Sequence, residues 1–182
     1  YKYDTRDIFI DPTNGQEFTF KLKYYYSITG QDYQKISFSY KKYYSFLQNS
    51  WVQPVFSHKS VYLMTFPEYD LLPFIAYEYL GGKRFVRGYS SIPNDNDNSV
   101  IDMIESSNIL FHSMEVQSTL LEKREYYSIE LGLDWVVFLD LGLSCRNQHD
   151  FVWDDYLISY GLGIRFFLLG TELAIDVGFN PY

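Results

Sequence analysis

Apolar and polar residues alternate along most of this chain, which is the pattern of a β-strand with one apolar and one polar face. The clearest stretch is 131–143, where the odd positions are apolar and the even positions include Asp134 and Asp140. The same alternation recurs in 17–29, 35–46, 54–66, 109–121, 156–168 and 171–179. With a short segment at 6–10, the pattern predicts an all-β fold of about eight strands in an antiparallel meander.

The connections between these segments differ in length on the two sides of the expected sheet. Tight turns are expected at 12–15 and 169–171, opposite the long connections at 146–155 and 67–108, although 30–32 is short on the long side. This asymmetry, with strands of about ten to thirteen residues, is typical of a transmembrane β-barrel. A soluble lipocalin-like barrel gives the same alternation with its apolar face inward, so it stays open as an alternative.

Composition agrees with a folded β-protein. The chain has 182 residues, which suits one domain, and its 19 Tyr and 15 Phe favour strands and membrane interfaces. The net charge of −8 opposes binding to phosphate backbones, so nucleic acid is excluded as a partner class. Apolar runs such as 135–139 are too short for a spanning helix. The polar start lacks the pattern of a signal peptide, so we expect the chain to begin inside a longer precursor.

Candidate catalytic and metal-binding residues are scarce. Cys145 is the single cysteine, so no intrachain disulfide is expected. His58, His112 and His149 fall on different predicted elements without ligand spacing, and the Asn/Asp run at 94–98 lacks the Gly and distal Glu of a calcium loop. No Ser-His-Asp or Cys-His arrangement stands out. The sequence therefore predicts no enzyme, no metal and no cofactor.

The long connection 67–108 carries the most distinctive motif. A double glycine, Gly81-Gly82, precedes Val86-Arg87-Gly88-Tyr89. This arrangement resembles the tip of the sixth surface loop in the Omp85 superfamily, whose members insert or translocate polypeptides at outer membranes. A turn or two of helix also fits 100–106 within the same connection.

Further matches to this family follow in order along the chain. The run 138–142 resembles its F-x-D-x-G motif, and Glu115 stands where the family usually has an inward glutamate. Residues 4–7 with Pro12 and Gly15 resemble its D-x-R-D and P-x-x-G strand and turn, and 161–165 with 172–178 resemble its penultimate hairpin. The chain departs from the family at Gln117, where an arginine is frequent.

The resemblance implies a barrel of sixteen strands, of which this chain supplies the eighth to the fifteenth. Residues 1–182 then form a single C-terminal barrel region with an inward-folded loop at 67–108, while the periplasmic POTRA repeats and the last strand are absent. A self-contained eight-stranded barrel, or a dimer of such halves, also stays open.

The same resemblance implies assembly, insertion or translocation of other polypeptides without ATP or cofactor. Expected partners are the lipid bilayer, client outer-membrane or secreted polypeptides, and accessory lipoproteins. The expected location is the bacterial outer membrane, with an organelle outer membrane as the alternative. A passive porin or surface antigen, and a soluble lipocalin-like binder, are the rival functions.

The chemistry of Arg87 predicts its partners. A guanidinium carried into a barrel loses water and needs carboxylates that accept paired hydrogen bonds. Glu115 and Asp140 lie on the polar faces of adjacent predicted strands and are the expected partners. Asp134 shares that face, either as a solvated carboxylate or as a further contact.

Small and aromatic residues are expected to seat the loop. Gly81, Gly82 and Gly88 allow sharp turns and close approach to the wall. We expect Phe85 and Tyr89 to pack against Phe138, with Gly142 leaving space for them.

Overall fold

The computed structural model describes residues 1–28, 30–46, 52–90, 105–126, 129–146 and 156–181. Within them the chain forms an eight-stranded antiparallel sheet in the order β1-β2-β3-β4-β7-β8-β9-β10. The strands of this sheet are β1 (Lys2–Asp4), β2 (Gly15–Tyr25), β3 (Tyr33–Ser45), β4 (Val55–Phe66), β7 (Asn108–Tyr126), β8 (Ile129–Cys145), β9 (Leu157–Leu168) and β10 (Thr171–Phe179). The predicted all-β meander is confirmed.

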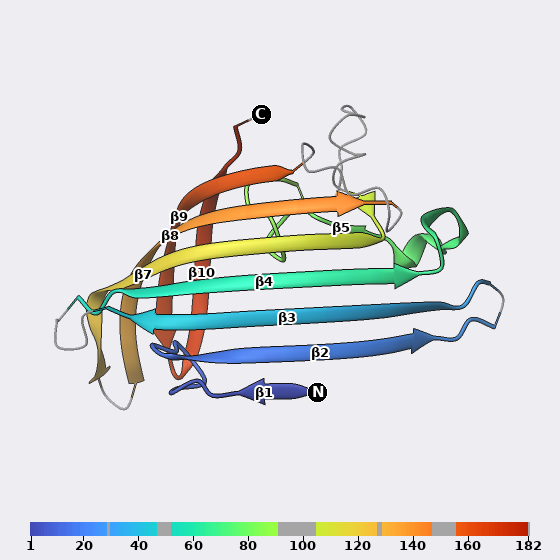
Figure 1. The fold of residues 1–182 in the computed structure, drawn as a ribbon. Helices are drawn as coiled ribbons and strands as arrows, with labels where there is room; N and C mark the ends of the chain where they lie inside the picture. The colour runs from blue at the N-terminus through green and yellow to red at the C-terminus, as the bar shows by residue number, and fades with distance from the viewer. Residues whose placement is uncertain (29, 47–51, 91–104, 127–128, 147–155, 182) are drawn as a thin grey trace.

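The sheet is curved, and among the described strands it is open. In Figure 1 the strands β2, β3, β4, β7 and β8 lie side by side, and β10 passes behind β4 and β7. Strands β1 and β10 are the two edges and do not pair with each other. This arrangement is that of a partial barrel.

The two faces of the sheet differ sharply. On the outer face, apolar side chains such as Leu22, Leu162 and Ile175 are 60–61% exposed. On the inner face, Val136, Phe138 and Asp140 are at most 2% exposed. The strand positions that carry the polar side chains therefore face the buried interior. A soluble sheet does the reverse and packs its apolar face into a core.

The start of the sheet corrects one predicted strand. The first strand is Lys2–Asp4, not 6–10. Arg6 turns back to form paired hydrogen bonds with Asp4 at 2.9 and 2.7 Å, and Asp7 accepts hydrogen bonds from both the backbone and the hydroxyl of Thr13. These local bonds stabilise a turn across 6–13 in place of an extended strand.

Three other strands differ in length from the sequence pattern: β2, β7 and β8, of which β8 extends two residues beyond 131–143 at each end. Strand β2 ends at Tyr25, because the backbone N–H of Ser27 donates to Asp32 at 2.9 Å and forms the turn early. Strand β7 continues to Tyr126, since its pairing with β8 shifts register between Thr119 and Leu121 and again before Arg124. Such bulges interrupt alternation without ending a strand.

The long connection contains short elements of its own. Two 3-10 turns, η1 (Tyr69–Leu71) and η2 (Phe74–Ala76), precede the strand pair β5 (Glu78–Tyr79) and β6 (Glu105–Ser106). The Tyr69 hydroxyl donates to Glu105, and burial together with this bond raises the pKa of Tyr69. Residues 100–104 of the expected helical turn lie outside the described residues, and Glu105 and Ser106 are in a strand. No helix in the described ranges is long and apolar enough to cross a membrane.

Candidate functional site

Residues 80–89 form a tight fold that carries Arg87 onto the inner face. The backbone N–H of Val86 donates to Leu80 O at 3.0 Å, and that of Gly82 donates to Val86 O at 3.0 Å. Gly82 adopts a φ of 87°, a conformation that side chains disfavour. The double glycine therefore permits the turn that presents Arg87.

The Arg87 guanidinium is surrounded by carboxylates from three strands. Its Nε and Nη2 donate to the two oxygens of Asp140 at 2.7 and 2.8 Å, in the paired geometry of an arginine and a carboxylate. Its Nη1 lies 2.6 Å from Glu115 Oε1 and 3.1 Å from Asp176 Oδ2. The Asp140 side chain is fully buried and that of Arg87 is 11% exposed, so the Arg87–Asp140 contact is shielded from water.

Further groups fix both members of the Arg87–Asp140 pair. The hydroxyl of Ser113 donates to Asp140 at 2.6 Å and accepts from Arg87 Nη2 at 3.2 Å. The backbone N–H of Arg87 also donates to Asp140, at 3.1 Å. The Phe138 ring lies beneath the guanidinium, with Arg87 Cζ 3.5 Å from the ring centroid. We call Arg87, Ser113, Glu115, Asp140 and Asp176 the arginine site.

Apolar packing around the site differs from the sequence expectation. The Phe85 ring packs edge-on against Phe111, with centroids 5.6 Å apart, in a cluster that also contains Tyr89. The ring of Phe138 packs against the Arg87 guanidinium instead. A Cβ on Gly142 would lie 2.5 Å from Val86 and 2.7 Å from Leu80, so Gly142 makes room for these two residues.

The tip of the loop approaches the last strand at backbone distance. Gly88 has a φ of 91°, and a Cβ on Gly178 would lie 2.6 Å from Gly88 N and 2.8 Å from Arg87 C. The Asn180 amide donates to Gly88 O at 2.8 Å, and the Tyr89 hydroxyl donates to Ile158 O at 3.2 Å. The tip therefore contacts β9 and the end of β10 as well as β8.

Asp176 and Arg165 belong to this region but were not among the predicted site residues. Arg165 is 5% exposed, bonds Asp176, and lies 3.3 Å from Glu172 and 3.9 Å from Glu115. Both residues occupy the alternate positions of their strands that face inward with the other polar side chains. This alternation is the feature of the sequence that could have identified them. Their convergence depends on the pairing of β9 with β10 and on the curvature of the sheet.

Asp134 is held by hydrogen bonding at the tight-turn end of the inner face. Gln117 Nε2 donates to Asp134 at 2.8 Å and to Asp11 at 2.8 Å, and Lys123 Nζ lies 2.5 Å from Asp11. Gln117 thus links the first turn of the chain to β8. Asp134 is 5% exposed and is not an ordinary solvated carboxylate.

Two of the three histidines are closer together than the sequence suggested. The Ser60 hydroxyl lies 3.2 Å from His58 and 2.9 Å from His112, on the outer face of β4 and β7. His149 lies outside the described residues. No group of three or more His, Cys, Asp or Glu suited to a metal occurs in the described part of the chain.

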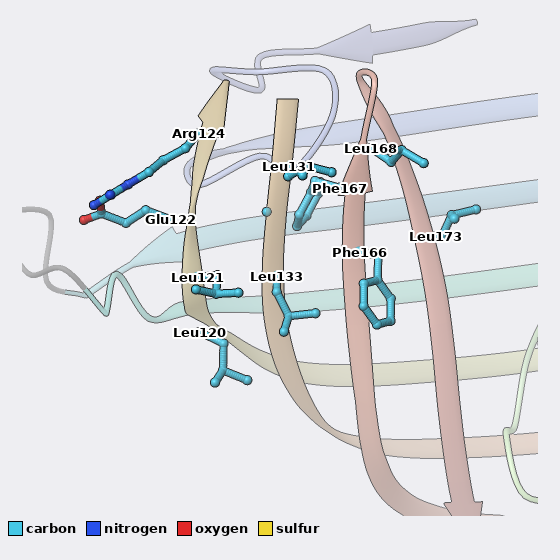
Figure 2. A pocket seen from close by; sticks show the side chains of 11 residues that line it. Leu120, Leu121, Glu122, Arg124, Leu131, Leu133, Phe166, Phe167, Leu168 and Leu173 are labelled. Atoms are coloured by element: carbon cyan, nitrogen blue, oxygen red, sulfur yellow. The ribbon is translucent and has the colours of Figure 1, made fainter. Parts of the chain in front are cut away.

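Cavities lie on both faces of the sheet in the described part of the chain. A polar one of about 300 Å³ adjoins the arginine site on the inner face. The larger, of about 710 Å³, is lined mainly by outward leucine and phenylalanine side chains at one end of β7 to β10 (Figure 2). The charged residues in its lining, Glu122 and Arg124, pair with each other at 3.3 Å. The larger cavity is therefore an apolar depression of the outer face and lacks the chemistry of the arginine site.

Comparison with known proteins gave one family. The model of the Omp85 superfamily domain matches residues 1–178, nearly the whole chain. A search of curated proteins gave no match.

Proposed function

The chain belongs to the Omp85 superfamily, and from this premise we propose that it is part of an outer-membrane barrel that assembles, inserts or translocates other polypeptides. The arginine site attaches the long loop to the barrel wall. The protein performs no chemical step and uses no ATP or cofactor. Strand pairing with clients and local distortion of the bilayer drive the process.

The observation that carries this proposal is the burial of Arg87 against Asp140, with Glu115 and Asp176 alongside. A surface loop that merely narrows a pore does not need a desolvated guanidinium held by three carboxylates. Removing one partner of a buried pair typically costs roughly 3–5 kcal/mol, because the remaining charge is left buried and unpaired, so the loss of either Arg87 or Asp140 is expected to displace the loop.

The outer face supports integration into a bilayer. Its apolar side chains, including Val137, Leu139 and Ile164, are 38–41% exposed and cover adjacent strands. Such a face is costly in water and is satisfied by lipid. We propose the bacterial outer membrane as the location, with client polypeptides and accessory lipoproteins as partners.

Replacing Leu139 by Arg is expected to destabilise the membrane-inserted protein. Leu139 is outward on β8, and an arginine on a lipid-facing site near mid-membrane costs about 2–4 kcal/mol. The measurement is the unfolding midpoint in urea after folding into lipid vesicles. Ser39→Arg, on the inner parity of β3, is the control and should change the midpoint little. Equal effects of the two changes would contradict the assignment of faces.

Depletion of the protein in its native host tests the function. Folded levels of other outer-membrane proteins, or secretion of a client polypeptide, should fall before any general loss of viability. A passive porin or surface antigen would instead leave client levels unchanged and alter only the passage of small solutes. That second outcome would reject the proposal.

A further inference from the structure

Charge is segregated across the inner face. Strands β2 to β4 carry five inward lysines and one inward carboxylate, Glu17, whereas β7 to β10 carry five inward carboxylates and two inward cations, Lys123 and Arg165. The lysines, here called the basic face, are Lys21, Lys23, Lys35, Lys41 and Lys59. The carboxylates, here called the acidic face, are Glu115, Asp134, Asp140, Glu172 and Asp176.

The acidic face is largely neutralised within the described structure. Arg87 and Arg165 occupy Asp140, Glu115, Asp176 and Glu172. The basic face is neutralised to a smaller extent. Glu17 pairs with Lys2 and Arg6, and Glu78 of the loop is shared by Lys35 and Arg84 at 2.6 and 2.8 Å. Lys21 and Lys23 have no ion-pair partner among the described residues.

Register makes the basic face costly for the protein alone. Lys23 lies directly opposite Lys35 on β2 and β3, and Lys41 lies between Glu17 on β2 and Lys59 on β4. Like charges at facing positions destabilise a sheet. A sequence that repeats this conflict on neighbouring strands indicates a requirement other than stability.

The basic face also has a cavity. A pocket of about 250 Å³ is lined by Lys21, Lys23, Lys35 and Arg84, with Glu78 as its carboxylate, and by the less polar Tyr25 and Leu63. Positive charge within a partly enclosed site concentrates anions. The mixture of lysines with aromatic and aliphatic groups suits a chain with varied side chains better than a simple ion.

We propose that the basic face binds an acidic segment of polypeptide in extended conformation. Lys21 and Lys23 are two residues apart on one side of β2, which spaces them about 6–7 Å along the strand and matches carboxylates on alternate residues of an extended peptide. The inference rests on the proposed function, since the segment belongs to a client polypeptide.

Binding of a labelled peptide to the intact protein in lipid nanodiscs tests this inference. The probe is a fluorescein-labelled peptide of ten residues with alternating Glu and Ser, and its partner is the same peptide with Gln in place of Glu. Fluorescence anisotropy should show binding of the Glu peptide and little binding of the Gln peptide. Affinity should fall about tenfold between about 50 and 500 mM salt, because exposed charges are screened.

Two variants locate the binding. The double change Lys21→Gln with Lys23→Gln should weaken binding of the Glu peptide roughly tenfold. Lys42→Gln is the matched control, because Lys42 adjoins Lys41 on β3 but faces outward, and it should change affinity less than about twofold. Salt dependence on the unchanged protein keeps the test independent of how well a variant folds.

Several results would overturn the inference. These are equal binding of the Gln and Glu peptides, affinity that is insensitive to salt, an equal effect of Lys42→Gln, or much tighter competition by inorganic triphosphate, which would identify a phosphate ligand. Normal client assembly with no peptide binding would reject the binding role of the basic face and leave the proposed function standing. Failure of the depletion experiment would reject the function on which it rests.

Discussion

Replacing Arg87 with Glu is expected to release the long loop from the barrel wall and to abolish most client assembly. The new carboxylate would face Asp140, Glu115 and Asp176, with Asp140 fully buried. Loss of one partner from a buried pair typically costs roughly 3–5 kcal/mol, and like charge adds repulsion. The buried side chains of Leu80, Phe85, Val86 and Tyr89 still hold the loop to the wall, so the release is expected as a raised population of the opened loop.

Limited trypsin digestion of intact cells measures the release. Cleavage after Lys83 or Arg84 should be slow in the unchanged protein and fast in the Arg87→Glu variant, alongside a fall in folded client proteins. Lys83→Glu is the control: it makes the same charge change four residues earlier at an exposed position outside the arginine site. Its digestion is followed at Arg84 and should resemble that of the unchanged protein. Normal assembly by the Arg87→Glu variant would contradict the proposed role of the arginine site.

Replacing Gly178 with Val should displace the loop without changing any charge. A Cβ at this position would lie 2.6 Å from Gly88 N and 2.8 Å from Arg87 C, and both are backbone atoms that cannot rotate away. The loop tip must therefore move back from β10. Because Arg87 Nη1 reaches Asp176 at 3.1 Å, even a small movement should lengthen that contact.

A graded series distinguishes displacement from general damage. Gly178→Ala should accelerate tryptic cleavage of the loop moderately, and Gly178→Val should accelerate it strongly. Val177→Ile, on the outward side of the same strand, adds volume toward lipid and should leave cleavage unchanged. An effect of Val177→Ile equal to that of Gly178→Val would show that strand β10 itself had been disrupted.

Alternation predicted most of the sheet. Strands β4, β9 and β10 begin and end within one residue of their expected bounds. Errors arose where side chains override alternation. Asp32 ends β2 early through Ser27, and bulges let β7 continue beyond Leu121.

The partners of Arg87 were predictable in part. Glu115 and Asp140 could be inferred because they lie on facing parities of adjacent strands, and both contact Arg87. Asp176 could not be singled out, because it is 89 residues from Arg87 and reaches it only through the curvature of the sheet. The neighbouring histidines and the facing lysines depend on strand register, which places His112 opposite Ser60 and Lys23 opposite Lys35.

Roles of individual aromatic residues were the least predictable. Phe138 was expected beneath Phe85 and Tyr89, but its ring supports the Arg87 guanidinium. Both arrangements satisfy the parity of the strand. The choice between them depends on the path of residues 80–89, which alternation does not determine.

The most direct test of the account is a charge exchange between Arg87 and Asp140. Tryptic cleavage of the loop is measured in Arg87→Glu, in Asp140→Arg and in the variant with both changes. If the Arg87–Asp140 pair holds the loop, each single change should accelerate cleavage and the double change should restore a substantial part of the protection. The contradicting result is a double variant whose cleavage is accelerated by as much as the two single changes combined. It would show that a direct Arg87–Asp140 pair does not attach the loop.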